Sequence, residues 1–167
     1  MPFSRPVVRP VVMGVSGSGK TTVGAALAEA LGLRFVDGDA LHPAANVAKM
    51  AAGIPLDDAD RAPWLDAIGA VLAGGQVVVA CSALKRAYRD RLRAAAPGLQ
   101  LVFLDGGPAL LASRMTARPG HFMPASLLDS QLATLERPEP GEHALTADIA
   151  DPVAEIVAAL VERMTSA

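Results

Sequence analysis

The stretch that decides the fold lies near the N-terminus and reads Gly14-Val15-Ser16-Gly17-Ser18-Gly19-Lys20-Thr21. It matches the pattern G-x-x-x-x-G-K-[ST], in which a glycine-rich backbone turns its N–H groups toward the phosphates of a nucleotide. An apolar, strand-like run covers residues 10–15, and a helical pattern follows over residues 21–31. Because strand, loop and helix follow in the order that phosphate binding requires, we predict a P-loop.

Each part of this loop has an expected role toward ATP and Mg²⁺. All eight residues are predicted to contact the nucleotide. Lys20 can bridge the β- and γ-phosphates, and its charge acts on the transferring phosphoryl group, so we predict that it is catalytic. The hydroxyl of Thr21 is a predicted ligand of Mg²⁺.

Strand and helix patterns alternate along the rest of the chain. Further strands are expected at residues 33–37, 76–81, 99–104 and 144–149, and helices at 43–53, 57–73, 85–96, 108–117, 125–137 and from 151 onward. The continuously apolar strand at 76–81 suits a parallel sheet covered on both faces. We therefore predict one three-layer α/β/α domain over residues 1–167, with a five-stranded parallel sheet.

Composition excludes several functional classes. Fifteen basic and 17 acidic residues give a net charge of −2, which argues against nucleic-acid binding. A single cysteine, Cys81, allows no internal disulfide and fits a reducing, cytoplasmic compartment. Residues 67–84 carry no charge, but Gly74-Gly75 divides this run and a β-branched segment follows, so no membrane span is expected.

An acidic pair, Asp37 and Asp39, follows the predicted second strand. Many P-loop proteins place an aspartate after the third strand, where this chain has Cys81 and Ser82 instead. In extended backbone, residues two apart face the same side, so both carboxylates are expected in the cleft at the carboxyl ends of the strands. We predict that Asp37 holds hydrated Mg²⁺ and that Asp39 receives the proton of the acceptor hydroxyl. The alternative is a solvated acidic turn.

The acceptor site is expected in residues 40–75 and in the loop after the third strand. These segments combine carboxylates, which bind hydroxyls, with cations, which bind a carboxylate, as a polyhydroxy acid requires. Besides Asp39, the predicted acceptor-binding residues are His42, Lys49, Arg61, Ser82, Lys85 and Arg86. His42 could equally start a helix without touching a ligand. Trp64 and Cys81 are expected to be core residues.

Residues 114–124 have the composition of a mobile lid between two helices. Arg114 and Arg118 are four residues apart and share one face if the helix continues that far. Such a lid can neutralise charge on the phosphates and exclude water, so Arg118 is a predicted catalytic residue. The alternative is a solvated loop with ordinary surface arginines.

Several longer stretches are similar to those of one known family. They are the P-loop, Asp37-Gly38-Asp39 with Leu41-His42-Pro43, Asp60-Arg61 with Pro63-Trp64-Leu65, Cys81-Ser82-Ala83-Leu84-Lys85 with Tyr88-Arg89-Asp90, Gly120-His121-Phe122, and Thr134-Leu135-Glu136. Together these stretches resemble the small, thermoresistant-type gluconokinases.

This resemblance implies a nucleoside-monophosphate-kinase-like fold with a mobile lid. It also implies ATP with Mg²⁺, phosphorylation of the terminal hydroxyl of D-gluconate, and a homodimer in many relatives. Thr22 joins the phosphate-binding residues, Arg114 and Arg118 take the lid role, and His121 joins the acceptor site.

Two other functions stay open from the sequence. Shikimate kinase shares a P-loop and a D-x-D pair, but that family would imply a glycine-rich stretch where this chain has residues 81–85. The second alternative is a P-loop protein that binds a nucleotide without phosphorylating an acceptor. Release of ADP with and without gluconate would distinguish a kinase from such a binding protein.

Overall fold

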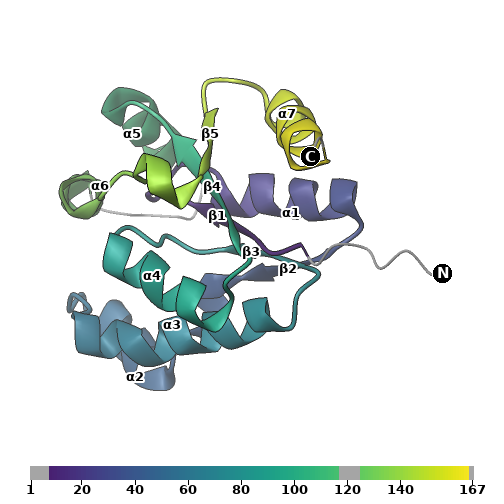
Figure 1. The fold of residues 1–167 in the computed structure, drawn as a ribbon. Helices are drawn as coiled ribbons and strands as arrows, with labels where there is room; N and C mark the ends of the chain where they lie inside the picture. The colour runs from purple at the N-terminus through teal and green to yellow at the C-terminus, as the bar shows by residue number, and fades with distance from the viewer. Residues whose placement is uncertain (1–7, 117–124, 166–167) are drawn as a thin grey trace.

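The computed structural model describes residues 8–116 and 125–165, in which helices cover both faces of a parallel sheet (Figure 1). Its strands are β1 (Pro10–Met13), β2 (Arg34–Asp37), β3 (Val77–Ala80), β4 (Gln100–Asp105) and β5 (Leu145–Asp148). They pair in parallel in the order β2-β3-β1-β4-β5. This confirms the predicted three-layer fold and its five-stranded sheet, and it makes β1 the central strand.

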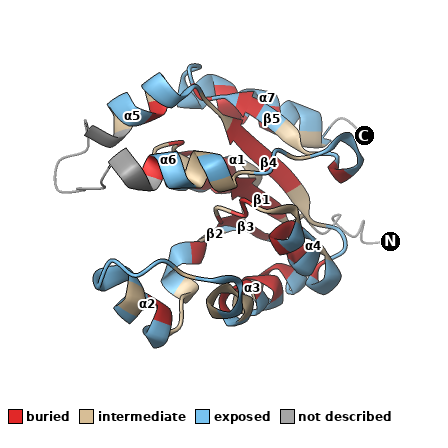
Figure 2. Ribbon diagram, turned by 90° about the vertical axis from the view of Figure 1, so that its left-hand side faces the viewer, coloured by how far each residue is buried: buried red, intermediate tan, exposed pale blue. Residues whose placement is uncertain are grey.

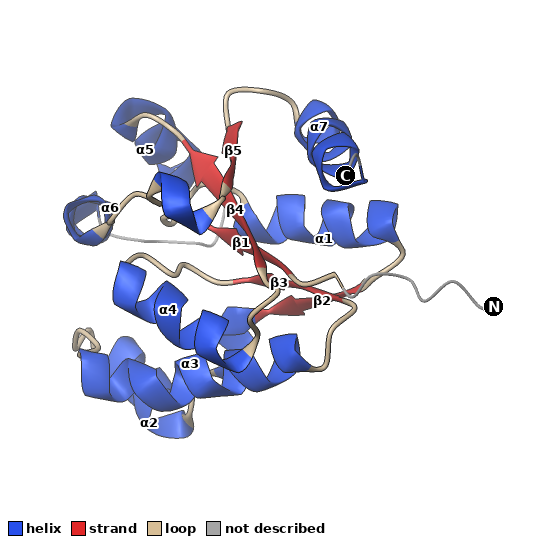
Figure 3. Ribbon diagram, viewed as in Figure 1, coloured by secondary structure: helices blue, strands red, loops and turns tan. Residues whose placement is uncertain are grey.

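Helices connect the strands in the predicted positions (Figure 3). They are α1 (Lys20–Leu31), α2 (Ala44–Ala51), α3 (Asp58–Ala73), α4 (Arg86–Ala95), α5 (Pro108–Thr116), α6 (Ala125–Thr134) and α7 (Val153–Thr165). Two short 3₁₀ helices were not predicted, namely η1 (Gly38–Leu41) and η2 (Pro140–Glu142). α6 ends at Thr134, three residues before the predicted end.

Alternate side chains along the strands pack into two separate hydrophobic cores, one on each face of the sheet. Val12 and Val102 pack on the side of α1 and α7, whereas Val11 and Val79 pack on the side of α3 and α4. All four residues of β1 and of β3 are buried, as Figure 2 shows for the middle of the sheet. Burial on both faces explains why these strands are continuously apolar.

The start of α3 is fixed by its own acidic residues. The Asp57 carboxylate accepts the N–H of Asp60 at 2.7 Å, and the Asp60 carboxylate accepts the N–H of Asp57 at 3.0 Å. This capping box confirms the predicted acidic cap. Farther along α3, Gly69 allows close approach to α4, since an added Cβ would lie 2.7 Å from Ala95 Cβ. The C-terminal parts of the two helices therefore pack closely against each other.

The uncharged run of residues 67–84 is divided as predicted into the end of α3, a turn and the buried strand β3. In the ranges that the structure describes, we find no helix with both the length and the apolar surface needed to cross a membrane.

Candidate active site

The phosphate loop joins β1 to α1 and turns sharply at its glycines. Gly19 caps α1 with a φ of 88°, a left-handed conformation that a side chain would strain. Gly14 has no room for a side chain, because an added Cβ would lie 2.8 Å from Ser18 Oγ. The loop is therefore a backbone turn that leads directly into the N-terminus of a 12-residue helix.

This loop fits the phosphates of ATP and the ion that accompanies them. No side-chain cap is found on α1 among the described residues, so its first N–H groups and the positive end of its dipole suit an anion. Lys20 Nζ lies 3.1 Å from the carbonyl oxygen of Val15, across the loop. The side chains of Thr21 and Thr22 are exposed at the same end. Backbone donors, a cation and hydroxyls at a helix N-terminus are the groups that a P-loop offers to ATP and Mg²⁺.

Asp37 lies on extended backbone as the last residue of β2 but Asp39 does not, so the expectation that both residues share one extended segment was wrong. β2 ends at Asp37, and the next four residues form η1, so the two aspartates do not alternate along a strand. The Asp37 carboxylate instead accepts the N–H of Asp39 at 3.0 Å, the local bond by which aspartate favours a turn. Gly38 permits this turn, since an added Cβ would lie 2.5 Å from the carbonyl oxygen of Ala80. Asp39 remains exposed.

Asp39 and Lys20 both act electrostatically on Cys81, the residue after β3. Burial raises the pKa of the Cys81 thiol to about 12, with the Asp39 charge raising that pKa and the Lys20 charge lowering it. The charges of Asp39 and Lys20, both predicted to be catalytic, therefore act on the same thiol group at the end of β3. Cys81 is 1% exposed and stays protonated at neutral pH, in agreement with its predicted core role.

His42 is held in one orientation by its neighbours. Its ring stacks on Trp64, with centroids 4.3 Å apart and planes at 10°. Asn46 Nδ2 donates to the backbone carbonyl of Asp60 at 2.9 Å, and the same nitrogen lies 3.1 Å from His42 Nδ1. His42 Nδ1 is therefore the acceptor, and the neutral ring carries its proton on Nε2. Burial lowers the pKa of His42, which favours this neutral form.

Two of the predicted acceptor cations, Arg61 and Lys85, gather around Tyr88. Arg61 Nη1 donates to the Tyr88 hydroxyl at 3.2 Å and to the carbonyl oxygen of Leu56 at 2.8 Å. Lys85 Nζ lies 3.5 Å from Asp58 Oδ1, and the Tyr88 hydroxyl donates to that same oxygen at 2.6 Å. Residues from α3 and from the start of α4 thus share one polar cluster.

The other two predicted cations lie elsewhere. Lys49 Nζ is bound by both carboxylate oxygens of Asp60, at 2.9 and 2.8 Å. Arg86 pairs with Glu139 and also lies 3.7 Å from Asp90. The structure therefore does not bring Arg86 into the cluster of Arg61 and Lys85.

The loop between β3 and α4 lies against the phosphate loop. Gly14 donates its N–H to the carbonyl oxygen of Ser82 at 3.4 Å. The next residue, Ala83, has a φ of 44°, which is uncommon for a side chain, and Arg89 Nη1 donates to its carbonyl oxygen at 2.9 Å. Arg89 is itself held by Glu142, with contacts of 2.7 and 3.1 Å, and both side chains are at most 1% exposed.

Part of the predicted lid can be placed. Arg118 and His121 lie outside the described residues. Arg114, in the last turn of α5, donates to the carbonyl oxygen of Ile149. Gln131 of α6 accepts the N–H of Ser16, in the phosphate loop, at 2.6 Å. The helix after the predicted lid thus contacts the phosphate loop directly.

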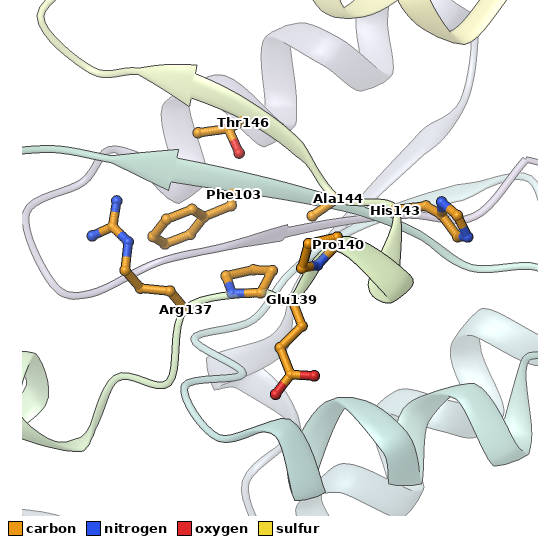
Figure 4. A pocket seen from close by; sticks show the side chains of 8 residues that line it. Phe103, Arg137, Glu139, Pro140, His143, Ala144 and Thr146 are labelled. Carbon is orange, nitrogen blue, oxygen red and sulfur yellow. The ribbon is translucent and has the colours of Figure 1, made fainter.

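Two cavities lie along β4 and β5. One has a volume of about 280 Å³ and is walled by Phe103 and Arg137, whose guanidinium carbon lies 5.3 Å from the ring centroid (Figure 4). A neighbouring cavity of about 350 Å³ shares Arg137 and Thr146 with it. Neither is lined by a residue of the phosphate loop or of the acceptor segments.

Sequence reasoning gave no role to Tyr88, Arg89, Gln131 or Glu142. The burial of Arg89 could have been predicted from the sequence, because it lies three residues before Leu92 on a helix face that is otherwise apolar and buried. A charge at such a position requires a buried partner. No pattern in the sequence identifies Glu142 as that partner.

Comparison with known proteins agrees with this geometry. Residues 11–138 match the family model described as AAA domain. A gluconokinase of Gluconobacter oxydans is 57% identical over 133 residues, covering 77% of this chain and 75% of that protein. The crystal structure of a gluconokinase from Sinorhizobium meliloti superposes with a TM-score of 0.86 at 55% identity, covering 96% and 97% of the two chains. A shikimate kinase from Bacteroides thetaiotaomicron, 18% identical with a TM-score of 0.70 over 95% and 98% of the chains, shares the fold alone.

Proposed function

The chain belongs to the gluconokinase family, and from this premise we propose that it transfers the γ-phosphate of ATP to the terminal hydroxyl of D-gluconate. The products are ADP and 6-phospho-D-gluconate. One observation supports this most: the phosphate-binding loop follows β1, the exposed carboxylate of Asp39 follows β2, and Lys85 follows β3, where it shares the Tyr88 ring with Arg61 of α3. Parallel α/β sheets bind their ligands at this edge of the sheet.

The protein forms no covalent bond to the substrates in this step and acts by positioning them and by stabilising charge. The acceptor oxygen forms a bond to the γ-phosphorus, the bond to the bridging oxygen of ADP breaks, and Asp39 takes the hydroxyl proton. Lys20 neutralises charge on the transferring group, as Arg114 and Arg118 would do from the lid. Thr21 and Asp37 would hold Mg²⁺, which neutralises phosphate charge when bound.

The acceptor is selected by charge and by hydrogen bonds. Arg61 and Lys85 are assigned to its carboxylate, because the structure places them together. His42 and Ser82, with His121 of the lid, are assigned to its hydroxyls. Lys49 is paired with Asp60 and Arg86 with Glu139, outside the Tyr88 cluster, so we do not assign the carboxylate to these two cations.

A coupled assay of ADP release tests this function. Gluconate should stimulate release, and its kcat/KM should exceed that of neutral glucose by about 10²-fold, since a charged partner is lost with glucose. The product should be a substrate of 6-phosphogluconate dehydrogenase, which establishes the position of the phosphate. Release that does not depend on an acceptor would leave a nucleotide-binding protein, and turnover of shikimate alone would support the other alternative.

We further propose a homodimer in the cytoplasm. The homodimer follows from the family resemblance, and the compartment follows from the single buried cysteine. Light scattering at micromolar concentration would test the first proposal, and fractionation of the native cells would test the second.

A further inference from the structure

Tyr88 lies in the first turn of α4, facing α3, and is only 7% exposed. Its ring centroid is 5.5 Å from Arg61 Cζ and 5.6 Å from Lys85 Nζ. Cations at this distance from an aromatic ring are attracted by its quadrupole. One ring thus positions two cations that are 24 residues apart in the sequence, Arg61 of α3 and Lys85 at the N-cap of α4.

The hydroxyl of Tyr88 extends this arrangement. It accepts a hydrogen bond from Arg61 at 3.2 Å and donates one to Asp58 Oδ1 at 2.6 Å. The same carboxylate oxygen lies 3.5 Å from Lys85 Nζ. Burial and the bond to Asp58 both raise the pKa of Tyr88, so its hydroxyl keeps the proton that it donates.

The charges of this cluster do not cancel. Arg61 and Lys85 contribute two positive charges and Asp58 one negative charge, which leaves a net charge of +1. The cluster is open to solvent, because the Lys85 and Asp58 side chains are 35% and 71% exposed. A single carboxylate from a bound ligand would therefore neutralise it and could reach it.

From this geometry we propose that Tyr88 determines the preference for an anionic acceptor, by holding Arg61 and Lys85 where they bind the acceptor carboxylate. The proposal rests on the proposed function and deepens it. Tyr88 is a positioning residue in this scheme, because it acts through the two cations and does not touch the reacting atoms.

The test separates the hydroxyl of Tyr88 from its ring. Tyr88→Phe keeps the ring and removes the hydrogen bonds to Arg61 and Asp58, whereas Tyr88→Leu removes both. Asp66→Asn is the matched control, because the exposed Asp66–Arg91 pair, at 2.7 and 2.9 Å, also joins α3 to α4. For each variant, kcat and the KM values for gluconate and for ATP are measured together with Tm.

In Tyr88→Phe, the KM for gluconate should rise about tenfold, the cost of losing hydrogen bonds to charged groups. The KM for ATP and kcat should stay within twofold of the wild type. Tyr88→Leu should raise the gluconate KM further, and Asp66→Asn should leave both KM values unchanged. A purely structural role would lower Tm without this separation of the two KM values.

Two results would overturn the proposal while leaving the function intact. In the first, the wild type phosphorylates gluconate, but Tyr88→Phe leaves the KM for gluconate unchanged or raises the KM values for gluconate and ATP equally. The other needs no variant: a crystal structure of the wild type with gluconate in which the carboxylate binds Lys49 or Arg86. A wild type that does not phosphorylate gluconate would instead refute the proposed function.

Discussion

Replacing Glu142 with glutamine should lower the free energy of unfolding by about 3–5 kcal/mol, because it leaves the buried charge of Arg89 without its counter-charge. The pair is bidentate, at 2.7 and 3.1 Å, and its side chains are 0% and 1% exposed. Glu142 also accepts from Arg93 and from the N–H of Glu139 at 2.8 Å. Glutamine keeps the shape of the side chain but removes the charge.

The pH dependence gives an independent magnitude. Burial by itself raises the pKa of Glu142, but hydrogen bonds from Arg89 and Arg93 outweigh it and lower the pKa from 4.5 to about 2. That fall corresponds to about 3 kcal/mol at 1.36 kcal/mol per pH unit. Because the folded-state pKa is depressed, this stabilisation is complete above the unfolded pKa and is lost as the pH falls from about 4.5 toward 2.

Urea unfolding of the wild type and of Glu142→Gln between pH 7 and pH 3 measures both effects. At pH 7 the variant should also melt about 10 °C lower, given about 2–4 °C per kcal/mol for a domain of this size. Asp66→Asn, which removes an exposed ion pair, should cost less than about 1 kcal/mol. The reasoning would be refuted by a Glu142→Gln variant within 1 kcal/mol of the wild type at pH 7, or by a difference that does not narrow toward pH 3.

Three further predictions concern turnover, the Mg²⁺ requirement and the binding of ATP. Lys20→Ala should lower kcat by about 10²-fold or more with an unchanged circular dichroism spectrum, and a loss within twofold would contradict its catalytic role. Asp39→Asn should lower kcat by about 10²-fold, whereas Asp37→Asn should raise the Mg²⁺ concentration needed for half-maximal rate. Normal rates and normal Mg²⁺ titrations in both variants would make the pair a solvated turn. Gln131→Leu should raise the KM for ATP about fivefold without changing that for gluconate, since the Ser16 N–H loses its acceptor; equal changes in both would contradict a specific effect on the phosphate loop.

Local patterns account for the parts of the fold that were predicted correctly. The phosphate loop, the five strands and the helices between them each depend on residues close together in the chain. The strand order is different, because it depends on which strands pair across distances of 40 to 90 residues. η1 was missed for another reason: a single hydrogen bond from the Asp39 N–H to the Asp37 carboxylate decides between a turn and a continued strand.

The residues of the candidate site also fall into a group that could be predicted from the sequence and a group that could not. Asp39, Arg61 and Lys85 could be named from residue type and position, because Asp39 and Lys85 follow predicted strands and Arg61 lies near the start of a predicted helix. The residues that hold the loops of the site in place could not be predicted. Arg89 and Glu142 are 53 residues apart, and Ser16 and Gln131 are 115 apart, so only the folded chain brings them together.

The central place of β1 has a consequence for how the protein is made. β1 leaves the ribosome well before the two strands that flank it, which are β3 (Val77–Ala80) and β4 (Gln100–Asp105). A nascent chain that ends before Asp105 cannot enclose the strand that carries the phosphate loop, and such distant pairings form slowly. ATP can therefore stabilise only a chain that extends past Asp105, and ribosome-stalled chains shorter than this should fail to bind it.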